Sequence, residues 1–346
     1  MKSFLRFLFV SDCVWVCQTL AAVLNKKGHF ARVVADKHEN VWNYGSEYVD
    51  SSTDTYKLMP TLRSIIMNKD IDVINSNNYT SWVEAEISRR LLGFSHIVIL
   101  HGSDIRELMQ GKMPAYKEQL LIRALKSADA ILATTPDLLR YSNIIGREIL
   151  HLPQPINTEI FSASACRNES LFGDPVIFSP TRLQTIKGAA NIIEILRQIV
   201  RAYPHSHIYQ VGWGDQEYLS LLSRKVSSEN LTLVKYLPRD QLPSWYVSAD
   251  VVMGQMETGI LSNIELEAMS CKTPVMVYDT YYDYGCPLKN PENAFEMASM
   301  VISDRSFRRT LIEKGLRMIN EKHDMNRVTE LYLKYVDNFH TCKLAF

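Results

Sequence analysis

Short runs of β-branched and apolar residues alternate with longer stretches of helical periodicity along the whole of this 346-residue chain. This alternation is typical of βαβ units, in which a crossover helix joins each parallel strand to the next. It predicts an α/β fold built on parallel sheets. Because domains usually contain about 150 residues, the length predicts two such domains, each with its own core.

The alternating pattern occurs twice. The candidate strands of the first half are Phe7–Val10, Ala31–Ala35, Asp72–Asn75, His96–Leu100, Ala130–Thr134 and Glu148–Leu152. Those of the second half are Val176–Ser179, Ile208–Val211, Leu231–Val234, Val251–Met253 and Pro274–Tyr278. Helices are expected between them, for example over Pro60–Asn68, where proline suits the first helical position. Two similar Rossmann-like sheets are therefore expected.

A stretch without clear periodicity, Pro153–Asp174, separates the two halves and is rich in Pro, Asn and Ser. It reads as a linker between domains. We predict a first domain over 1–155, a second over 156–325, and a C-terminal helix over 326–346 that can pack back on the first domain. Parallel sheets bind ligands beyond the carboxyl ends of their strands, so we expect the two sheets to face each other across a ligand-binding cleft.

Charge and cysteine content exclude several classes of protein. Lys+Arg and Asp+Glu number 38 each, so the chain lacks the basic excess of a duplex-binding protein, and no nucleic-acid partner is expected. The six cysteines are scattered without a C-x-x-C pair, which favours a reducing, cytoplasmic compartment. Arg6, Asp12 and Gln18 interrupt the apolar N-terminus, which argues against a membrane span. Membrane attachment is therefore expected to be peripheral at most, and no metal site is expected.

Two cations follow the strand Val176–Ser179, in the segment Pro180–Gly188. The next helix carries a buried apolar stripe, which should hold its N-terminus near the sheet edge. Unpaired N–H groups at that N-terminus, together with Arg182 and Lys187, suit a pyrophosphate. The alternative is that both cations are solvated beside an ordinary helix start.

The segment Glu257–Met269 follows the strand Val251–Met253 and contains several carboxylates. Ser262 and Glu265 have the spacing of a capping box, so Glu265 is expected to cap a helix rather than to act in catalysis. Glu267 lies on another helical face, where its carboxylate is expected to be free to bind a ligand's hydroxyls, such as a ribose diol. The alternative is a solvent-facing glutamate.

His101–Arg106 directly follows the strand His96–Leu100. His101 can hydrogen-bond a sugar or a phosphate, and Gly102 allows close approach of the backbone to a ligand. The alternatives are that backbone groups satisfy the histidine and that Asp104 caps a helix.

In this order and spacing, the segments resemble the retaining glycosyltransferases of family 4, which have the two-domain GT-B fold. Arg182–Gly188 resembles the family's R-L-x-x-x-K-G element, and His101–Asp104 resembles its H-G-x-D loop. Leu152–Phe161 is similar to its interdomain crossing, and Glu267-Ala268-Met269 to the end of its E-x7-E motif. Two features depart from the family pattern: Gly259 occupies the place of the first glutamate of E-x7-E, and the glycine-rich loop after the first strand is absent.

The resemblance implies a retaining, metal-independent hexosyltransferase without a cofactor. It would move a sugar from a UDP- or GDP-linked donor to a hydroxyl of a glycan or lipid-linked glycan. The second domain would bind the donor, and the first domain would form the acceptor side. The implied catalytic residues are Arg182, Lys187 and His101. The implied donor-binding residues are Glu267, Glu257, Gly259, Ile260, Leu261, Asn263, Gly102 and Asp104. Backbone N–H groups of Gly259–Leu261 are expected to replace part of the missing glutamate's function.

Two alternatives stay open at this point. One is a sugar-nucleotide epimerase with the same sheets. The other is a sugar-nucleotide-binding protein that has lost activity, which the displaced first glutamate makes conceivable. The sequence does not define the oligomeric state.

Overall fold

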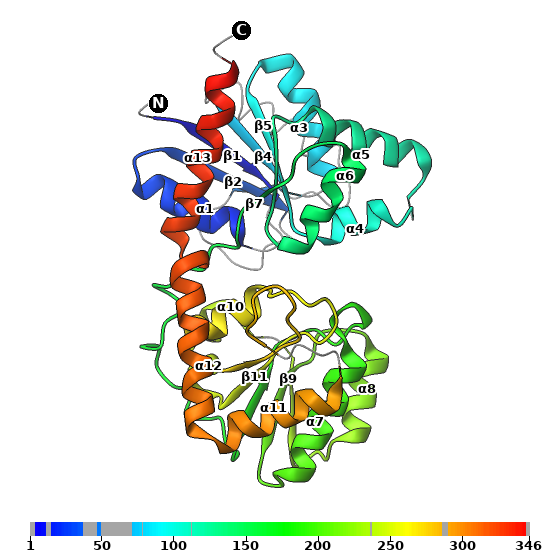
Figure 1. Cartoon of the computed structure of the whole chain (residues 1–346), viewed down its shortest axis with the longest axis vertical. Helices are drawn as coiled ribbons and strands as arrows, with labels where there is room; N and C mark the ends of the chain where they lie inside the picture. The colour runs from blue at the N-terminus through cyan, green and yellow to red at the C-terminus, as the bar shows by residue number, and fades with distance from the viewer. Residues whose placement is uncertain are drawn as a thin grey trace. The chain divides into compact units, whose positions relative to one another are not determined.

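The computed structural model describes residues 4–11, 15–36, 47–49, 71–77, 79–111, 113–235, 237–285 and 290–343. The chain divides into two compact units. The first unit contains Met1–Pro155 together with Met325–Phe346, and the second contains Ile156–Asp324. Each unit is an α/β layer structure, with helices packed on a parallel sheet (Figure 1).

A parallel sheet of seven strands, in the order β3-β2-β1-β4-β5-β6-β7, forms the centre of the first unit. Its strands are β1 (Arg6–Val10), β2 (Phe30–Asp36), β3 (Glu47–Val49), β4 (Val73–Ser76), β5 (Ser95–Leu100), β6 (Ala130–Ala133) and β7 (Leu150–His151). Its helices are α1 (Val16–Lys26), α3 (Tyr79–Leu92), α4 (Ser103–Met109), α5 (Ala115–Ser127), η2 (Pro136–Tyr141), α6 (Ser142–Ile145) and α13 (Met325–Lys343). The sequence pattern did not predict β3, and the helix predicted over Pro60–Asn68 lies outside the described residues.

The C-terminal helix α13 packs against α1 on one face of this sheet (Figure 1). Val328, Tyr332 and Val336 of α13 are buried in the same apolar cluster as Phe7 and Phe9 of β1. These three residues recur at spacings of four along the helix, which places them on one side of it. The last segment of the chain therefore completes the core of the first unit.

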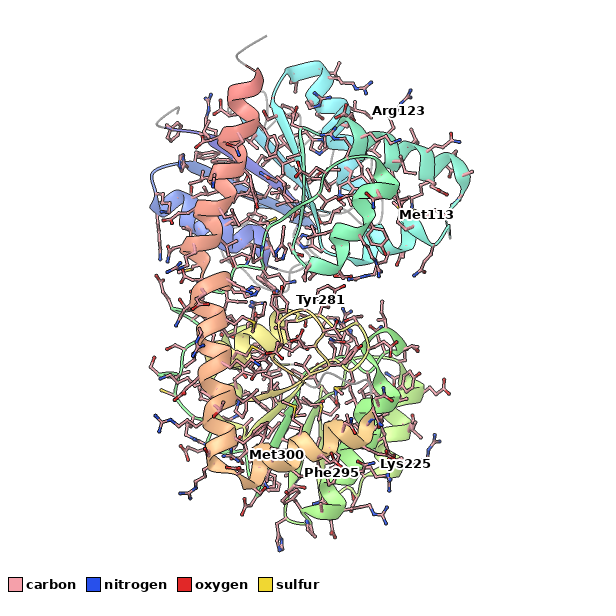
Figure 2. All side chains as sticks on the ribbon, in the orientation of Figure 1. Met113, Arg123, Lys225, Tyr281, Phe295 and Met300 are labelled. Carbon is pink, nitrogen blue, oxygen red and sulfur yellow. The ribbon has the colours of Figure 1, made fainter. Side chains whose placement is uncertain are left out.

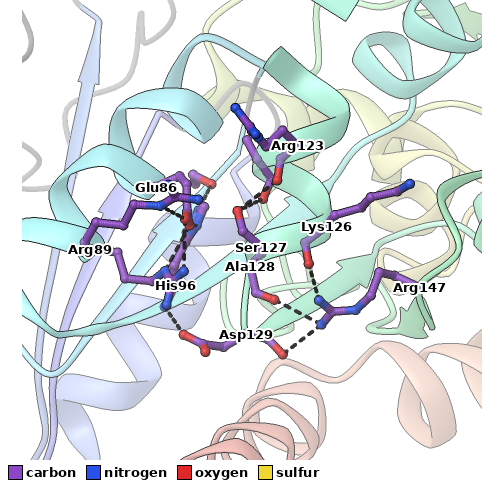
Figure 3. Close-up of polar contacts among 12 residues, drawn as sticks. Glu86, Arg89, His96, Arg123, Lys126, Ser127, Ala128, Asp129 and Arg147 are labelled. Carbon is purple, nitrogen blue, oxygen red and sulfur yellow. Dashed lines mark hydrogen bonds and ion pairs between the residues drawn. The ribbon is translucent and has the colours of Figure 1, made fainter. Parts of the chain in front are cut away.

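A cluster of charged side chains around the buried Glu86 stabilises the other helical layer of the first unit (Figure 3). Glu86 on α3 accepts two hydrogen bonds from Arg89, at 2.9 Å each, and one from Arg90 at 2.8 Å. His96 Nδ1 of β5 lies 3.6 Å from the same carboxylate. Burial alone would raise the pKa of Glu86, but the contacts with His96, Arg89, Arg90 and Ser127 outweigh burial and hold that pKa well below its usual range.

A five-stranded parallel sheet, in the order β10-β9-β8-β11-β12, forms the centre of the second unit. Its strands are β8 (Val176–Ser179), β9 (His207–Val211), β10 (Leu231–Val234), β11 (Val251–Met253) and β12 (Val275–Met276). Its helices are η3 (Thr185–Lys187), α7 (Ala189–Ala202), α8 (Gln216–Lys225), η4 (Arg239–Gln241), α9 (Leu242–Ser248), α10 (Asn263–Ser270), α11 (Pro291–Ser303), α12 (Arg305–Met318) and η5 (Ile319–His323).

The predicted apolar stripe of α7 is confirmed: Ile192, Leu196 and Ile199 are fully buried in the core of the second unit. Helix α11 packs against α7, with Ala294, Ala298 and Val301 on its buried side. Figure 2 shows Phe295 and Met300 on the same helix, and Met300 is exposed. Both helices cover the sheet with one apolar face, so the N-terminus of α7 is fixed at the carboxyl end of β8.

Candidate functional site

The segment Arg182–Gly188 forms the connection from β8 to α7, as the sequence predicts. Thr185–Lys187 form a single 3₁₀ turn, and Gly188 has a left-handed φ of 76°, which starts α7. Glycine adopts this conformation without the steric penalty of a Cβ. Arg182 is exposed and Lys187 is half-buried, so the connection that leads into α7 carries two cations. This arrangement suits an anionic ligand.

This loop packs directly on the second predicted cluster. The backbone N–H of Met256 donates to the carbonyl of Lys187 at 2.9 Å. A Cβ at Gly188 would lie 2.7 Å from the carbonyl carbon of Met256, closer than van der Waals contact allows. The structure therefore brings the Arg182–Gly188 loop and the segment after β11 together at the carboxyl edge of one sheet.

A fully buried glutamine, Gln255, organises the segment after β11. Its Oε1 accepts from the backbone N–H groups of Glu257 at 2.9 Å and Thr258 at 2.7 Å. Its Nε2 donates to the carbonyls of Ile260 at 2.6 Å and Tyr278 at 3.0 Å. One side chain thus satisfies four backbone groups. Gln255 was not predicted from the sequence, because a lone glutamine between Gly254 and Met256 belongs to no motif.

The backbone N–H groups of Gly259, Ile260 and Leu261 donate to no atom of the described residues. All three residues are buried, and Gly259 has a left-handed φ of 69°. Buried amides are nearly always paired, so three consecutive unpaired ones indicate a place for an external acceptor. They immediately precede α10, whose N-terminus adds a partial positive charge. The expectation that these amides take over part of the missing glutamate's function stays a prediction.

The capping box at the start of α10 is confirmed. Ser262 accepts from the third backbone N–H of the helix, and Glu265 accepts from the N–H of Ser262 at 2.8 Å. The second carboxylate oxygen of Glu265 accepts from the N–H of Gln255 at 2.9 Å. Glu265 is completely buried and supports the loop from behind. It lies eight positions after Glu257, the spacing of E-x7-E, which shows that spacing alone does not identify a ligand-facing pair.

Glu267 differs from the expectation of a carboxylate that is free for a ligand. It is 1% exposed. One of its oxygens accepts a hydrogen bond from Arg239 of η4, and the other lies 3.4 Å from the hydroxyl of Tyr246 on α9. Burial raises the pKa of Glu267 to about 7, although Arg239 opposes this shift. In this conformation Glu267 ties α10 to η4 and α9.

Two more of the predicted donor-binding residues flank these amides. Glu257 is half-buried and lies between Gln255 and Gly259. Asn263 is the first residue of α10 and is also half-buried. Both therefore lie beside the unpaired N–H groups at the same edge of the sheet.

An aromatic side chain that the predicted site did not include, Trp213, lies beside Arg182. The Arg182 guanidinium lies 4.7 Å from the centre of the Trp213 ring, and that side chain is 63% exposed. Backbone hydrogen bonds join Leu183 to Trp213 and Asp215 on either side of Gly214, where a Cβ would lie 2.5 Å from the carbonyl oxygen of Leu183. Gly214 therefore allows the backbone after β9 to pack closely against the Arg182–Gly188 loop.

In the first unit, His101 lies directly after β5, as predicted. Its Nε2 lies 3.0 Å from Oδ1 of Asn77, which follows β4. Burial lowers the pKa of His101 to about 4, so the ring is neutral at pH 7. Asn77 was not predicted from the sequence, because its contact with His101 joins the ends of two neighbouring strands that a helix separates along the chain.

Gly102 precedes α4 with a φ of 118°, and a Cβ there would lie 2.3 Å from the guanidinium of Arg106. Arg106 forms an ion pair of 2.5 Å with Asp137. The glycine therefore makes room for this ion pair. Asp104 lies in the first turn of α4, and its side chain lies outside the described part of the structure.

Two family models match the chain, and together they cover most of it. The model described as Glycosyltransferase Family 4 matches residues 14–159, and the one described as Glycosyl transferases group 1 matches residues 166–295. The chain belongs to the family 4 type of GT-B glycosyltransferases. Arg182, the three unpaired amides and Glu267 all lie within the second match.

Solved structures with the same fold cover almost the whole chain. Sucrose-phosphate synthase from Thermosynechococcus elongatus superposes with a TM-score of 0.76 at 14% identity, over 97% of this chain and 100% of that one. A glycosyltransferase from Rickettsia africae ESF-5 gives 0.72 at 12% identity, over 98% and 99%. Anabaena HepE in complex with UDP-glucose gives 0.71 at 15% identity, over 96% and 99%. These likenesses establish the α/β fold of this glycosyltransferase.

No protein of curated function matches the sequence. Within the described part of the chain, no helix combines the length and the apolar character that a membrane crossing requires.

Proposed function

We propose that this glycosyltransferase moves a hexose from a UDP- or GDP-linked donor to a hydroxyl of a glycan or lipid-linked glycan, with retention of anomeric configuration and without a metal ion. The donor class is supported by HepE, a structural neighbour bound to UDP-glucose. We place the enzyme in the cytoplasm, with at most peripheral attachment to a membrane. The scattered cysteines support that compartment.

The observation that carries this proposal is the pairing of two loops at one sheet edge. The Arg182–Gly188 loop supplies two cations and the start of α7, and the segment Gly259–Leu261 supplies three N–H groups that bond to nothing in the described part of the chain. The backbone N–H of Met256, three residues before Gly259, donates to the carbonyl of Lys187 and so joins the two loops. Diphosphate oxygens are strong acceptors, and a concave set of cations and amides is the chemistry that binds them.

The same groups would act on the reaction itself. The bond between the sugar's anomeric carbon and the diphosphate oxygen breaks while the acceptor oxygen bonds to that carbon. The acceptor's proton passes to the departing diphosphate, which gains negative charge in the transition state. Arg182, Lys187 and the amides stabilise that charge, and this stabilisation accelerates transfer because it is strongest in the transition state.

The test is transfer from UDP- and GDP-sugars by the wild type and by Arg182→Ala/Lys187→Ala. Charge-assisted hydrogen bonds contribute about 1.5–3 kcal/mol each, so we expect kcat/KM to fall by about two to four orders of magnitude with the fold retained. Arg201→Ala/Lys225→Ala is the matched control, since both residues are exposed cations in the last turns of α7 and α8. Equal turnover by the two double variants would refute the assignment. NMR of the product determines the anomeric configuration.

A second candidate is a donor-binding protein with impaired catalysis. Two observations favour it. Gly259 stands in the place of a glutamate, and the carboxylate of Glu267 is hydrogen-bonded to Arg239 and Tyr246. Tight nucleotide-sugar binding without transfer or donor hydrolysis would support this candidate over the enzyme.

A further inference from the structure

Asn77 is held rigidly beside His101. It is fully buried, and it follows β4 at the carboxyl edge of the first unit's sheet. Its side-chain Nδ2 donates to the carbonyl of Val10 at 3.1 Å, and its backbone N–H donates to Ser81 Oγ at 3.1 Å. Its Oδ1 lies 3.0 Å from His101 Nε2. The side-chain amide of Asn77 is therefore anchored to β1 and to the histidine, and its backbone N–H is anchored to α3.

These contacts fix which way the amide points. The carbonyl of Val10 can only accept a hydrogen bond, so the amide group next to it must be the NH₂. The reverse orientation would place two carbonyl oxygens against each other at 3.1 Å. Oδ1 must therefore face His101, and because an amide oxygen only accepts, Nε2 must carry the proton.

The proton position has a consequence for the other ring nitrogen. A neutral imidazole carries one proton, so protonated Nε2 leaves Nδ1 with a lone pair. Nδ1 is buried and has no hydrogen-bond partner among the residues that the structure describes. A buried acceptor without a donor is unfavourable, and a ligand that donates a hydrogen bond would remove this cost.

We propose that Asn77 is a positioning residue that fixes the Nε2–H tautomer of His101, so that Nδ1 accepts a hydrogen bond from a hydroxyl of the bound sugar. This inference rests on the proposed function, which supplies the sugar. It also selects the ligand group. The two phosphates of a nucleotide-sugar diphosphate are each singly ionised at pH 7, so their oxygens carry no proton to donate, whereas every free sugar hydroxyl does. An unprotonated Nδ1 of His101 therefore suits a sugar hydroxyl rather than a phosphate oxygen.

The tautomer is tested in the free protein by imidazole ¹H–¹⁵N NMR at pH 7, with the His101 resonances assigned from their loss in His101→Gln. We expect an unprotonated Nδ1 and a protonated Nε2 in the wild type. Asn77→Ala should raise the fraction of the Nδ1–H form, and Asn77→Asp, which keeps an acceptor oxygen, should retain the Nε2–H form. Asn25→Ala is the control, because the Nδ2 and Oδ1 of Asn25 hydrogen-bond to the backbone of Ala31 rather than to a histidine.

A protonated Nδ1 in the wild type, or an unchanged tautomer in Asn77→Ala, would overturn the proposal. This readout needs no substrate, so it is independent of the proposed function. Absence of transfer from every nucleotide sugar would count against that function and leave the tautomer result standing.

Transfer kinetics test the role of Nδ1. The side-chain amide of asparagine occupies the place of Nδ1, and that of glutamine occupies the place of Nε2. We therefore expect His101→Asn to keep a higher kcat/KM than His101→Gln. We expect Asn77→Ala to lower kcat/KM by between about twofold and about tenfold, which is the effect of losing one neutral hydrogen bond. The reverse order of the two histidine variants would contradict an acceptor at Nδ1.

Discussion

Replacing Gln255 with alanine is expected to damage both stability and donor binding. The side chain satisfies two N–H groups and two carbonyls of the loop after β11, and it is fully buried. At about 1 kcal/mol for each hydrogen bond, the loss amounts to about 4 kcal/mol. That is a large part of the 5–15 kcal/mol by which a typical domain is stable.

The donor should be affected through the amides that Gln255 positions. Gly259 and Ile260 lie inside the segment that Gln255 holds at both ends. Misplacing one amide that bonds to a charged phosphate oxygen costs about 1.5–3 kcal/mol. We therefore expect the donor KM or Kd to rise between about tenfold and about a hundredfold.

The assay combines urea unfolding with titration of UDP and GDP. Asn230→Ala is the matched control, since Asn230 donates to the carbonyls of Pro204 at 2.9 Å and Ser206 at 2.7 Å at the amino end of β10. It should lower stability without changing nucleotide affinity. If Gln255→Ala binds nucleotide as tightly as Asn230→Ala does, the role assigned to the loop is refuted.

Three further substitutions test other parts of the structure. Glu86→Gln should lower the free energy of unfolding at pH 7, and urea unfolding at pH 7 and pH 3 measures it. The difference from wild type should shrink as the pH falls below about 4, because a lowered folded-state pKa stabilises fully above the unfolded pKa and progressively less as the pH falls towards the folded one. Gly188→Ala should destabilise more than Gly28→Ala, since both glycines have a left-handed φ but only Gly188 meets backbone within 4 Å; a larger loss in Gly28→Ala would contradict this. Trp213→Ala should raise the donor KM about two- to fivefold through loss of its cation–π contact with Arg182, and Trp213→Phe should restore most of it; donor kinetics decide.

Sequence patterns predicted the strands and the helix cap whose formation depends on residues that are near one another in the chain. The bounds of β8, β10 and β11 coincide with the predicted strands, and the capping box of Ser262 and Glu265 is present. Alternation, helical stripes and capping spacings are properties of neighbouring residues, so they can be read without knowing the tertiary contacts.

Contacts between distant residues were not predictable. The partner of Glu267, Arg239, lies 28 positions away. Nothing in the spacing of E-A-M indicates that this arginine would bury the carboxylate. Gln255 and Asn77 act through contacts that the fold creates, so no motif marks them. The absence of a glycine after β1 did not indicate the local backbone conformation either. Ser11, the first residue after β1, adopts a left-handed φ of 64° although it is not a glycine.

We infer that cations and amides at the carboxyl edge of the second unit's sheet bind a nucleotide diphosphate. Isothermal titration of UDP and GDP against the wild type and Arg182→Ala/Lys187→Ala tests it most directly. We predict that the wild type binds at least one of the two nucleotides and that the double variant binds it at least about a hundredfold more weakly, with an unchanged melting temperature. Equal affinity of the two proteins, or no binding of either nucleotide to the wild type, would contradict the claim.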